Sequence, residues 1–125
     1  MDKPSILVVD DELLIRDLLY DFFSGQGWNI SVAENGEKAL DIINSNKIDL
    51  VLSDIRMPEM DGLTLTSRVK ESHPEIPIVL MTGFPSVDTA VTALRSKVED
   101  YVIKPFNINQ LYKLVESKLC SNEGQ

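Results

Sequence analysis

Two patterns of apolar and polar residues alternate along this 125-residue chain. Short, largely apolar runs at 5–9, 48–52, 78–81 and 101–103 end abruptly in polar residues. Such runs are typical of strands that are covered on both faces of a parallel sheet. Residues 29–33 alternate between polar and apolar instead, so we expect this strand to be half exposed at a sheet edge.

Between these runs, apolar residues recur at the spacing of helices, and glycine or proline marks where the helices end. The first helix includes Leu14 and Leu18 and should end at Gly25 and Gly27. The third should stop before Pro74, because a residue that precedes proline is disfavoured in helical conformation. The remaining expected helices are a short one from 39 to about 46, one capped by Ser86 that carries Val87, Ala90, Val91 and Leu94, and one over 108–119.

Five strands that alternate with five helices predict a single α/β domain with a doubly wound parallel sheet and helices on both faces. The half-exposed second strand belongs at an edge, which favours the flavodoxin-like order 2-1-3-4-5. We expect one domain over 1–125, with a core of about 4–120. In this order the topological switch point lies between the first and third strands.

Composition narrows the environment and the partners. The chain has 12 Lys and Arg against 20 Asp and Glu, and this net charge of −8 argues against direct contact with nucleic acid. The only cysteine, Cys120, cannot pair within the chain, so we expect an inert thiol in a reducing compartment. No secretion signal or membrane-length apolar run occurs, and we expect a cytoplasmic protein without membrane contact.

Polar side chains follow the ends of four predicted strands. Asp10 and Asp11 follow the first, Asp54 the third, Thr82 the fourth and Lys104 the fifth. The carboxyl ends of parallel strands meet at one edge, so we expect these side chains to converge. Carboxylates brought together raise one another's pKa, and their repulsion calls for a cation. With no His or Cys nearby, oxygen ligands predict Mg²⁺, while His73 is expected on the surface.

Such a pocket suits phosphoryl transfer. With the metal bound, Asp54 could attack a phosphoryl group in line, while Lys104 and Thr82 hold its oxygens. Taken singly, the acids could be helix N-terminal charges, the lysine a solvated charge and the threonine a turn hydroxyl. Their joint placement at four strand ends favours the functional interpretation.

With these residues identified, the chain resembles a receiver domain of bacterial two-component response regulators over essentially its whole length. The acidic pair Asp10-Asp11 and the isolated acid Asp54 match the family's acidic pocket and phosphoacceptor. The match extends to the loop after the phosphoacceptor, the switch residues and the lysine motif: Met57-Pro58, Gly62, Thr82, Tyr101 and Lys104-Pro105-Phe106.

The resemblance implies that a histidine kinase donates its phosphoryl group to Asp54. It also implies Mg²⁺ held by Asp11, by Asp54, by Asp10 through water and by the backbone carbonyl of Arg56. A cis peptide bond is implied before Pro105. The module would not be an enzyme, because it would catalyse only its own phosphorylation and dephosphorylation.

Signalling would follow from a two-state change. The resemblance implies that Thr82 moves toward the phosphoryl group and Tyr101 turns inward. This would alter the face formed by the fourth helix, fifth strand and fifth helix, which contacts an output domain or a second copy of the chain. The sequence is also similar to receivers attached to transcription activators, at Asp88-Thr89-Ala90-Val91, Asp100-Tyr101 and Lys104-Pro105-Phe106.

Some positions depart from the family or leave its finer properties open. Lys97-Val98 replaces a common Gly-Ala pair before the fifth strand, which could change switching, and Arg56 and Phe84 occupy positions that tune phosphoryl lifetime. The sequence also allows three alternative functions to be compared with a receiver. A metal-dependent phosphohydrolase needs a second acid at the position that Arg56 occupies. A flavin-binding module needs a phosphate-binding loop rich in Ser, Thr and Gly, which this chain lacks. A scaffold that is never phosphorylated would not need the intact pocket.

Overall fold

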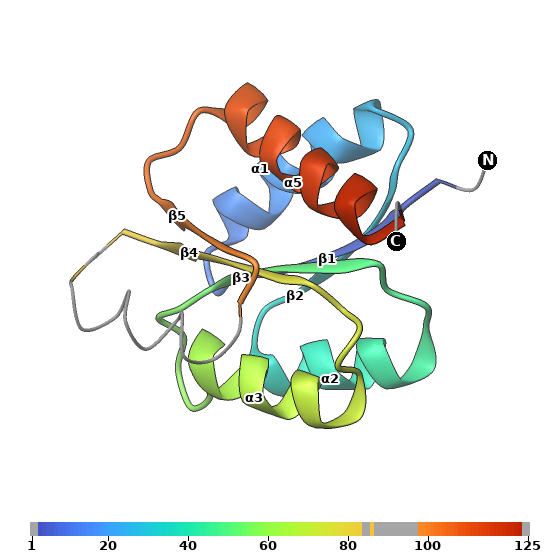
Figure 1. Ribbon diagram of the computed structural model, residues 1–125. Helices are drawn as coiled ribbons and strands as arrows, with labels where there is room; N and C mark the ends of the chain where they lie inside the picture. Colours follow the sequence, from blue (N-terminus) through green and yellow to red (C-terminus); the bar gives the residue numbers. More distant parts are fainter. Residues whose placement is uncertain (1–2, 84–85, 87–97, 124–125) are drawn as a thin grey trace.

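A computed structural model of the chain, which describes residues 3–83, 86 and 98–123, contains one sheet of five parallel strands in the order β2-β1-β3-β4-β5 (Figure 1). This confirms the predicted topology and puts the switch point between β1 and β3. The strands are β1 (Ser5–Val9), β2 (Asn29–Ala33), β3 (Leu50–Asp54), β4 (Ile78–Thr82) and β5 (Asp100–Ile103). As predicted, β2 is a partly exposed edge strand, whereas every residue of β3 and β4 is buried.

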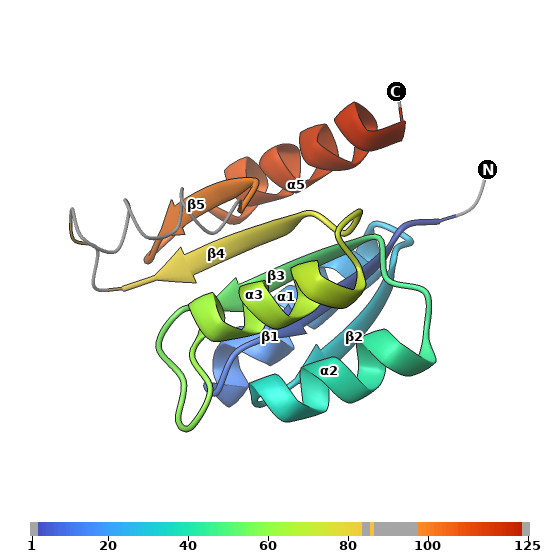
Figure 2. The ribbon, with the colours of Figure 1, turned by 60° about the horizontal axis from the view of Figure 1, so that its bottom comes forward.

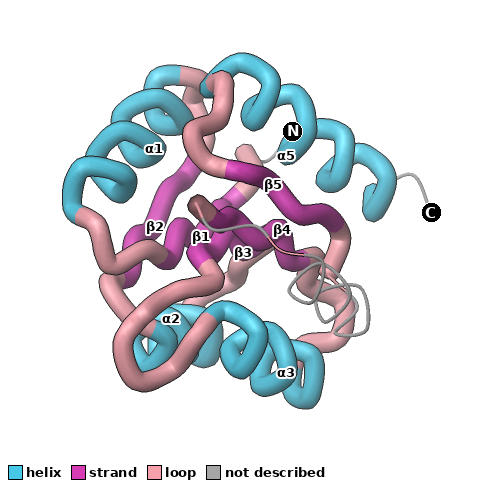
Figure 3. The backbone as a smooth tube through the Cα atoms, turned by 90° about the vertical axis from the view of Figure 1, so that its left-hand side faces the viewer, coloured by secondary structure: helices cyan, strands magenta, loops and turns pink. Residues whose placement is uncertain are grey.

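Helices cover both faces of the sheet. One face carries α1 (Leu13–Gly25) and α5 (Ile108–Glu123), and the other carries α2 (Gly36–Ser45) and α3 (Gly62–Ser72) (Figure 1). Figure 2 shows α2 and α3 beside each other in front of the sheet, and Figure 3 shows the two helical layers on opposite sides of the strands. None of the described helices is both long and apolar enough to cross a bilayer.

Two apolar layers, one on each face, hold the sheet between the helices. Leu7, Val51 and Leu80 belong to the layer under α2 and α3, and Ile6 and Leu52 belong to the layer under α1 and α5. Neighbouring residues of a strand thus point to opposite layers, as a strand's period of two requires. The continuous apolar runs of the sequence are explained by this burial on both faces.

Side-chain caps fix where two helices begin. Asn35 accepts a hydrogen bond from the backbone N–H of Lys38 at 2.9 Å, and Asp61 accepts one from Thr64 at 2.8 Å. Each cap satisfies a donor that the first helical turn leaves unpaired. The caps place the starts of α2 and α3, and hence the loops before them, at the carboxyl end of the sheet.

The structure differs from the sequence predictions at several boundaries. The strand expected over 48–52 runs from Leu50 to Asp54, so Asp54 ends the strand instead of following it. In α1 the fully buried residues are Leu19 and Phe23, whereas Leu14 is 80% exposed because the helix packs by a different face. The predicted helix after Ser86, with Phe84 and Lys97 beside it, and the side chain of Cys120 lie outside the described residues.

Candidate functional site

Two carboxylates are buried where β1 and β3 end. The side chain of Asp10 is fully buried, and only 6% of Asp54 is exposed. Backbone hydrogen bonds hold both positions in the sheet: the N–H of Asp10 donates to Ala33 at 3.1 Å, and the N–H of Ile55, directly after Asp54, donates to Met81 at 2.9 Å. The strand order therefore brings together acids that are 44 positions apart.

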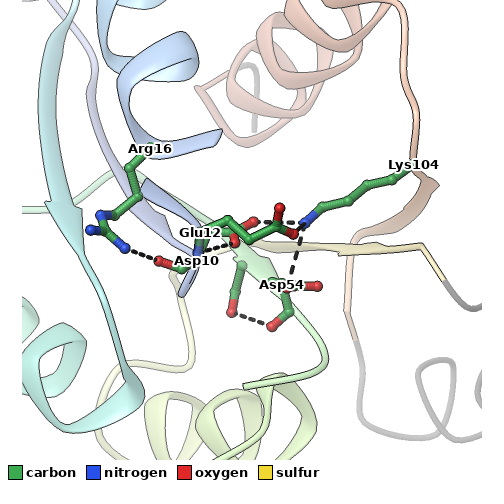
Figure 4. Close-up of polar contacts among 6 residues, drawn as sticks. Asp10, Glu12, Arg16, Asp54 and Lys104 are labelled. Carbon is green, nitrogen blue, oxygen red and sulfur yellow. Dashed lines mark hydrogen bonds and ion pairs between the residues drawn. The ribbon is translucent and has the colours of Figure 1, made fainter. Parts of the chain in front are cut away.

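Lys104 supplies the positive charge of this cluster (Figure 4). Its Nζ lies 2.8 Å from Asp10 Oδ2, 3.4 Å from Asp54 Oδ2 and 3.6 Å from Glu12 Oε1. The backbone N–H of Lys104 donates to the carbonyl of Thr82 at 2.7 Å, which fixes the end of β5 beside β4. The peptide bond between Lys104 and Pro105 is cis, as the resemblance implied.

Four carboxylates could share a cation at this edge. Asp10, Asp11, Glu12 and Asp54 each offer an oxygen, and these oxygens all lie within 4.8 Å of one another. Asp11 is exposed while Asp10 and Asp54 are buried. A pocket of about 230 Å³ opens here, lined by Asp11, Glu12, Asp54, Arg56, Gly83 and Lys104. The oxygen donors and the opening to solvent are suited to a hard divalent ion that keeps some of its water.

The electrostatics show why a cation would be favoured. Burial, and then the negative charge of Asp10, raise the pKa of Asp54 from 3.8 to about 6. Burial likewise raises the pKa of Asp10, although its hydrogen bond from Lys104 opposes the change. For Lys104, burial lowers the pKa, but the hydrogen bond and charge of Asp10, together with the charges of Asp54 and Glu12, outweigh it and leave the pKa raised. One ammonium thus compensates the acids only in part.

The loop after Asp54 folds back tightly against the strand end. The N–H of Gly62 donates to the carbonyl of Ile55 at 2.8 Å, and a Cβ at Gly62 would lie 2.4 Å from the backbone oxygen of Asp54. That same oxygen accepts a hydrogen bond from the buried hydroxyl of Ser53 at 2.9 Å. Only glycine fits this approach, so the requirement for Gly62 has a steric cause.

Three other predicted site residues lie at different positions relative to this pocket, and Tyr101 is not among the residues that line it. Arg56 lines it directly. Thr82 is the buried last residue of β4, and its neighbour Gly83 provides the lining there. Tyr101 is partly buried against the apolar layer that also covers α2 and α3, and its hydroxyl is buried with no hydrogen-bond partner in the part of the chain that the structure describes.

Two residues of the site were not identified from the sequence. Glu12 reaches Lys104, and the guanidinium of Arg16 donates to the backbone carbonyl of Asp10 at 2.7 Å (Figure 4). The run Asp10-Asp11-Glu12 could have suggested the third acid, since all three follow the same strand. Arg16 gave no such signal, because an arginine in a helix with mixed charges is usually solvated.

The comparisons with known proteins agree with this geometry. The model of the response regulator receiver domain matches residues 6–116. The chain belongs to this family. Members are receiver domains of two-component response regulators and act as phosphorylation-dependent signalling modules. This membership favours the receiver over the phosphohydrolase and flavin alternatives.

Individual relatives place this receiver domain among both single-domain and longer proteins. It is 40% identical over 119 residues to the transcriptional regulatory protein ZraR of Escherichia coli K12, which covers 95% of this chain and 27% of ZraR. A CheY-like receiver from Methanospirillum hungatei superposes with a TM-score of 0.95, 27% identity and 98% coverage of both chains. TrrA from Thermotoga maritima, solved in complex with Mg²⁺-BeF, has a TM-score of 0.83 and 36% identity, and the match covers 93% of this chain and 98% of TrrA.

The receiver domain thus spans about a quarter of the length of ZraR, the curated relative described above.

Proposed function

We propose that this receiver domain is switched by phosphorylation of Asp54, with the phosphohistidine of a sensor histidine kinase as donor. The observation that carries the proposal is a nearly buried carboxylate 3.4 Å from an ammonium, at the mouth of an open pocket. Nothing else in the cluster combines this burial with access from solvent: Asp10 is sealed, and Asp11 and Glu12 are exposed.

The transfer needs one bond made and one broken. A carboxylate oxygen of Asp54 attacks phosphorus, the new O–P bond forms, and the P–N bond to the donor imidazole breaks with its electron pair going to nitrogen. Lys104 holds a phosphoryl oxygen and stabilises the charge that grows there. Thr82 holds a second oxygen. The residues position the reactants and supply charge, and no further acid or base is required.

Mg²⁺ is the cofactor that the donor set fits. Asp11 and Asp54 would hold it directly, Asp10 through water, and the carbonyl of Arg56 would complete the protein ligands. Support comes from four converging carboxylates and from the raised pKa values of two of them, which a divalent charge would relieve. When bound, the ion supplies positive charge to the phosphoryl oxygens. TrrA, a relative of the same fold, was solved with Mg²⁺-BeF.

The downstream step is proposed on the same basis. Phosphorylation would draw Thr82 toward the phosphoryl group and change the position of Tyr101. The face of the fourth helix, β5 and α5 would then control an output domain or form a homodimer. The fourth helix that the sequence predicts after Ser86 lies outside the described residues. An output domain is supported by relatives such as ZraR, a transcriptional regulatory protein of which the matched region is 27%. We also propose that the domain works in the cytoplasm and that its folded core spans about residues 4–120.

Intact-mass spectrometry tests the phosphorylation step. The protein is incubated with acetyl phosphate and Mg²⁺, and we expect the mass of one phosphoryl group to be added to the wild type and to Asp21→Asn, a control that removes an exposed acid of α1. Asp54→Asn should not be labelled, while circular dichroism shows that it is folded. Equal labelling of wild type and Asp54→Asn would refute the assignment. Complete absence of labelling would favour the unphosphorylated scaffold.

A second measurement tests the consequence separately. Sedimentation velocity of labelled and unlabelled protein should show a shift toward dimer if the proposed face mediates self-association. An unchanged distribution would reject the homodimer and leave the phosphorylation of Asp54 standing.

A further inference from the structure

Lys104 is shared by three carboxylates that differ in how firmly they are held. Asp10 is the closest at 2.8 Å and is fully buried, and Asp54 is at 3.4 Å with 8% of its side chain exposed. Glu12 is the most distant at 3.6 Å, and 63% of its side chain is exposed. The pair with Glu12 is therefore the weakest of the three, because water screens an exposed ion pair most.

The backbone around Glu12 fixes where its side chain starts. Glu12 occupies the cap position before α1, and its own N–H donates to Asp10 Oδ1 at 2.9 Å. Its side chain makes no capping hydrogen bond to the helix. The carboxylate is consequently free of the usual role of an acid at this position and instead lines the pocket beside Asp54 and Lys104.

We propose that Glu12 is a positioning residue that limits the access of anionic phosphodonors by competing with the phosphoryl group for Lys104. The inference rests on the proposed phosphorylation of Asp54. A lysine ammonium has three N–H donors, and in this structure it faces three carboxylate oxygens. An incoming phosphoryl oxygen must replace one of them, and the pair with Glu12 is the least costly to break.

Glu12 acts on the donor in two ways with the same sign. Its negative charge at the pocket mouth repels a small anionic phosphodonor such as acetyl phosphate. Its carboxylate also occupies an N–H of Lys104 with which the phosphoryl oxygen would otherwise form a hydrogen bond. Both effects weaken binding of the donor before and during the transfer. Removing the charge should therefore lower the KM for acetyl phosphate more than it changes kcat.

The test measures phosphorylation rates against acetyl phosphate concentration at saturating Mg²⁺ for the wild type and Glu12→Gln. Because exposed charge interactions of this kind are weak, we expect the KM of Glu12→Gln to be about two- to fivefold lower than that of the wild type. Glu12→Asp keeps the charge but shortens the reach to Lys104, which is already 3.6 Å in the wild type, so its KM should lie between those of the wild type and Glu12→Gln. Asp21→Asn removes an equal charge from the same helix, away from the three ion pairs of Lys104, and should not change KM.

Ionic strength provides a readout that a merely structural role would not move. Salt screens charges at the exposed mouth, so the difference in KM between wild type and Glu12→Gln should shrink as salt is raised. A difference that stays constant with salt would contradict the electrostatic competition.

Calorimetric titration with Mg²⁺ separates this role from that of a metal ligand. Under our proposal Glu12→Gln binds Mg²⁺ within about twofold of the wild type. Weaker Mg²⁺ binding together with a higher KM would overturn the inference and make Glu12 a supporting ligand. An unchanged KM in a wild type that is labelled on Asp54 would overturn the inference alone, whereas a wild type that is never labelled would overturn the proposed function with it.

Discussion

The two ends of the sheet differ in the interactions that their side chains make. At the carboxyl end, buried acids crowd around Lys104, and their pKa values are raised by burial. At the amino end of β2, Trp28 stacks on Phe23 with ring centroids 5.2 Å apart and lies 5.0 Å from Tyr112, while Phe22 meets Phe23 edge-on at 5.7 Å. One end holds charges that oppose folding, and the other holds aromatic packing that favours it.

This difference indicates a division of labour within one small domain. Aromatic side chains gain free energy by burying area and by edge and stacked contacts. Buried carboxylates lose hydration and repel one another, so they lower stability until a cation arrives. We therefore expect variants at the aromatic end to change stability without changing phosphorylation per folded molecule, and variants in the pocket to change both, some in opposite directions.

The largest effect is expected from Phe23→Ala at the aromatic end. Phe23 is fully buried, and its removal leaves a cavity beside Trp28. Substitutions of this kind cost about 3–5 kcal/mol of unfolding free energy. Urea denaturation followed by circular dichroism measures the loss. Under conditions where the variant is still folded, its labelling by acetyl phosphate should match the wild type, and a loss of labelling would break the proposed separation of the two ends.

Asp54→Asn should raise the free energy of unfolding, whereas Phe23→Ala lowers it. The pKa of Asp54 rises from 3.8 to about 6 on folding, so the folded state favours the protonated form. Ionising the carboxyl above pH 6 lowers the free energy of unfolding by at most about 3 kcal/mol. In metal-free buffer at pH 7 the amide variant should therefore be more stable than the wild type, by a part of that amount.

The dependence on pH identifies the cause. Because the folded-state pKa is the higher one, the native protein binds more protons than the unfolded chain between about pH 4 and 6, and the wild type loses stability as pH rises through this window. Asp54→Asn lacks this contribution, so the advantage of the variant should grow across the window. Thermal denaturation at several pH values, with chelator present, measures it. Parallel curves for both proteins would contradict the raised pKa.

Much of the fold and pocket could be predicted because local patterns and topology determine them. The continuous apolar runs of β1, β3 and β4 require burial on both faces, and the parallel sheet then brings Asp10, Asp54 and Lys104 to one edge whatever the intervening loops contain. The alternating residues of β2 identified its edge position for the same reason. The strand order confirms these predictions.

The missed features depend on contacts that sequence spacing does not encode. Helical spacing alone could not decide which face of α1 is buried. Leu14 fits the apolar periodicity of the helix, but it is exposed and lies outside the core. The role of Arg16 depends on one hydrogen bond to a backbone carbonyl, and that of Glu12 on the reach of a side chain. The end of β3 was placed too early, since a strand can continue into polar residues when its neighbours keep pairing with it, as Asp54 does with Met81.

Gly62→Ala should produce an intermediate loss of stability at the pocket end. The added methyl would lie 2.4 Å from the backbone oxygen of Asp54, so the loop or the strand end must shift. Overpacking of this kind costs about 1–3 kcal/mol. Labelling of Asp54 should slow as well, because its backbone is displaced. The matched control is Gly25→Ala, where nothing lies within 4 Å of the added carbon and both measurements should stay near the wild type.

The smallest effect is expected from Arg16→Gln, which removes a charged donor from the carbonyl of Asp10. A hydrogen bond from a charged group contributes about 1.5–3 kcal/mol when it is buried, and partial exposure should reduce the loss to about 1 kcal/mol. The turn that carries Asp10 and Asp11 would be less firmly held, so Mg²⁺ binding should weaken in the same variant.

Arg16→Lys keeps the charge without the guanidinium geometry. If calorimetry shows Mg²⁺ binding restored by Lys, charge is the cause; if Lys behaves like Gln, the hydrogen bond to the turn is the cause. Unchanged stability and Mg²⁺ binding in Arg16→Gln would show that the turn is held by the strand pairing of β1 alone.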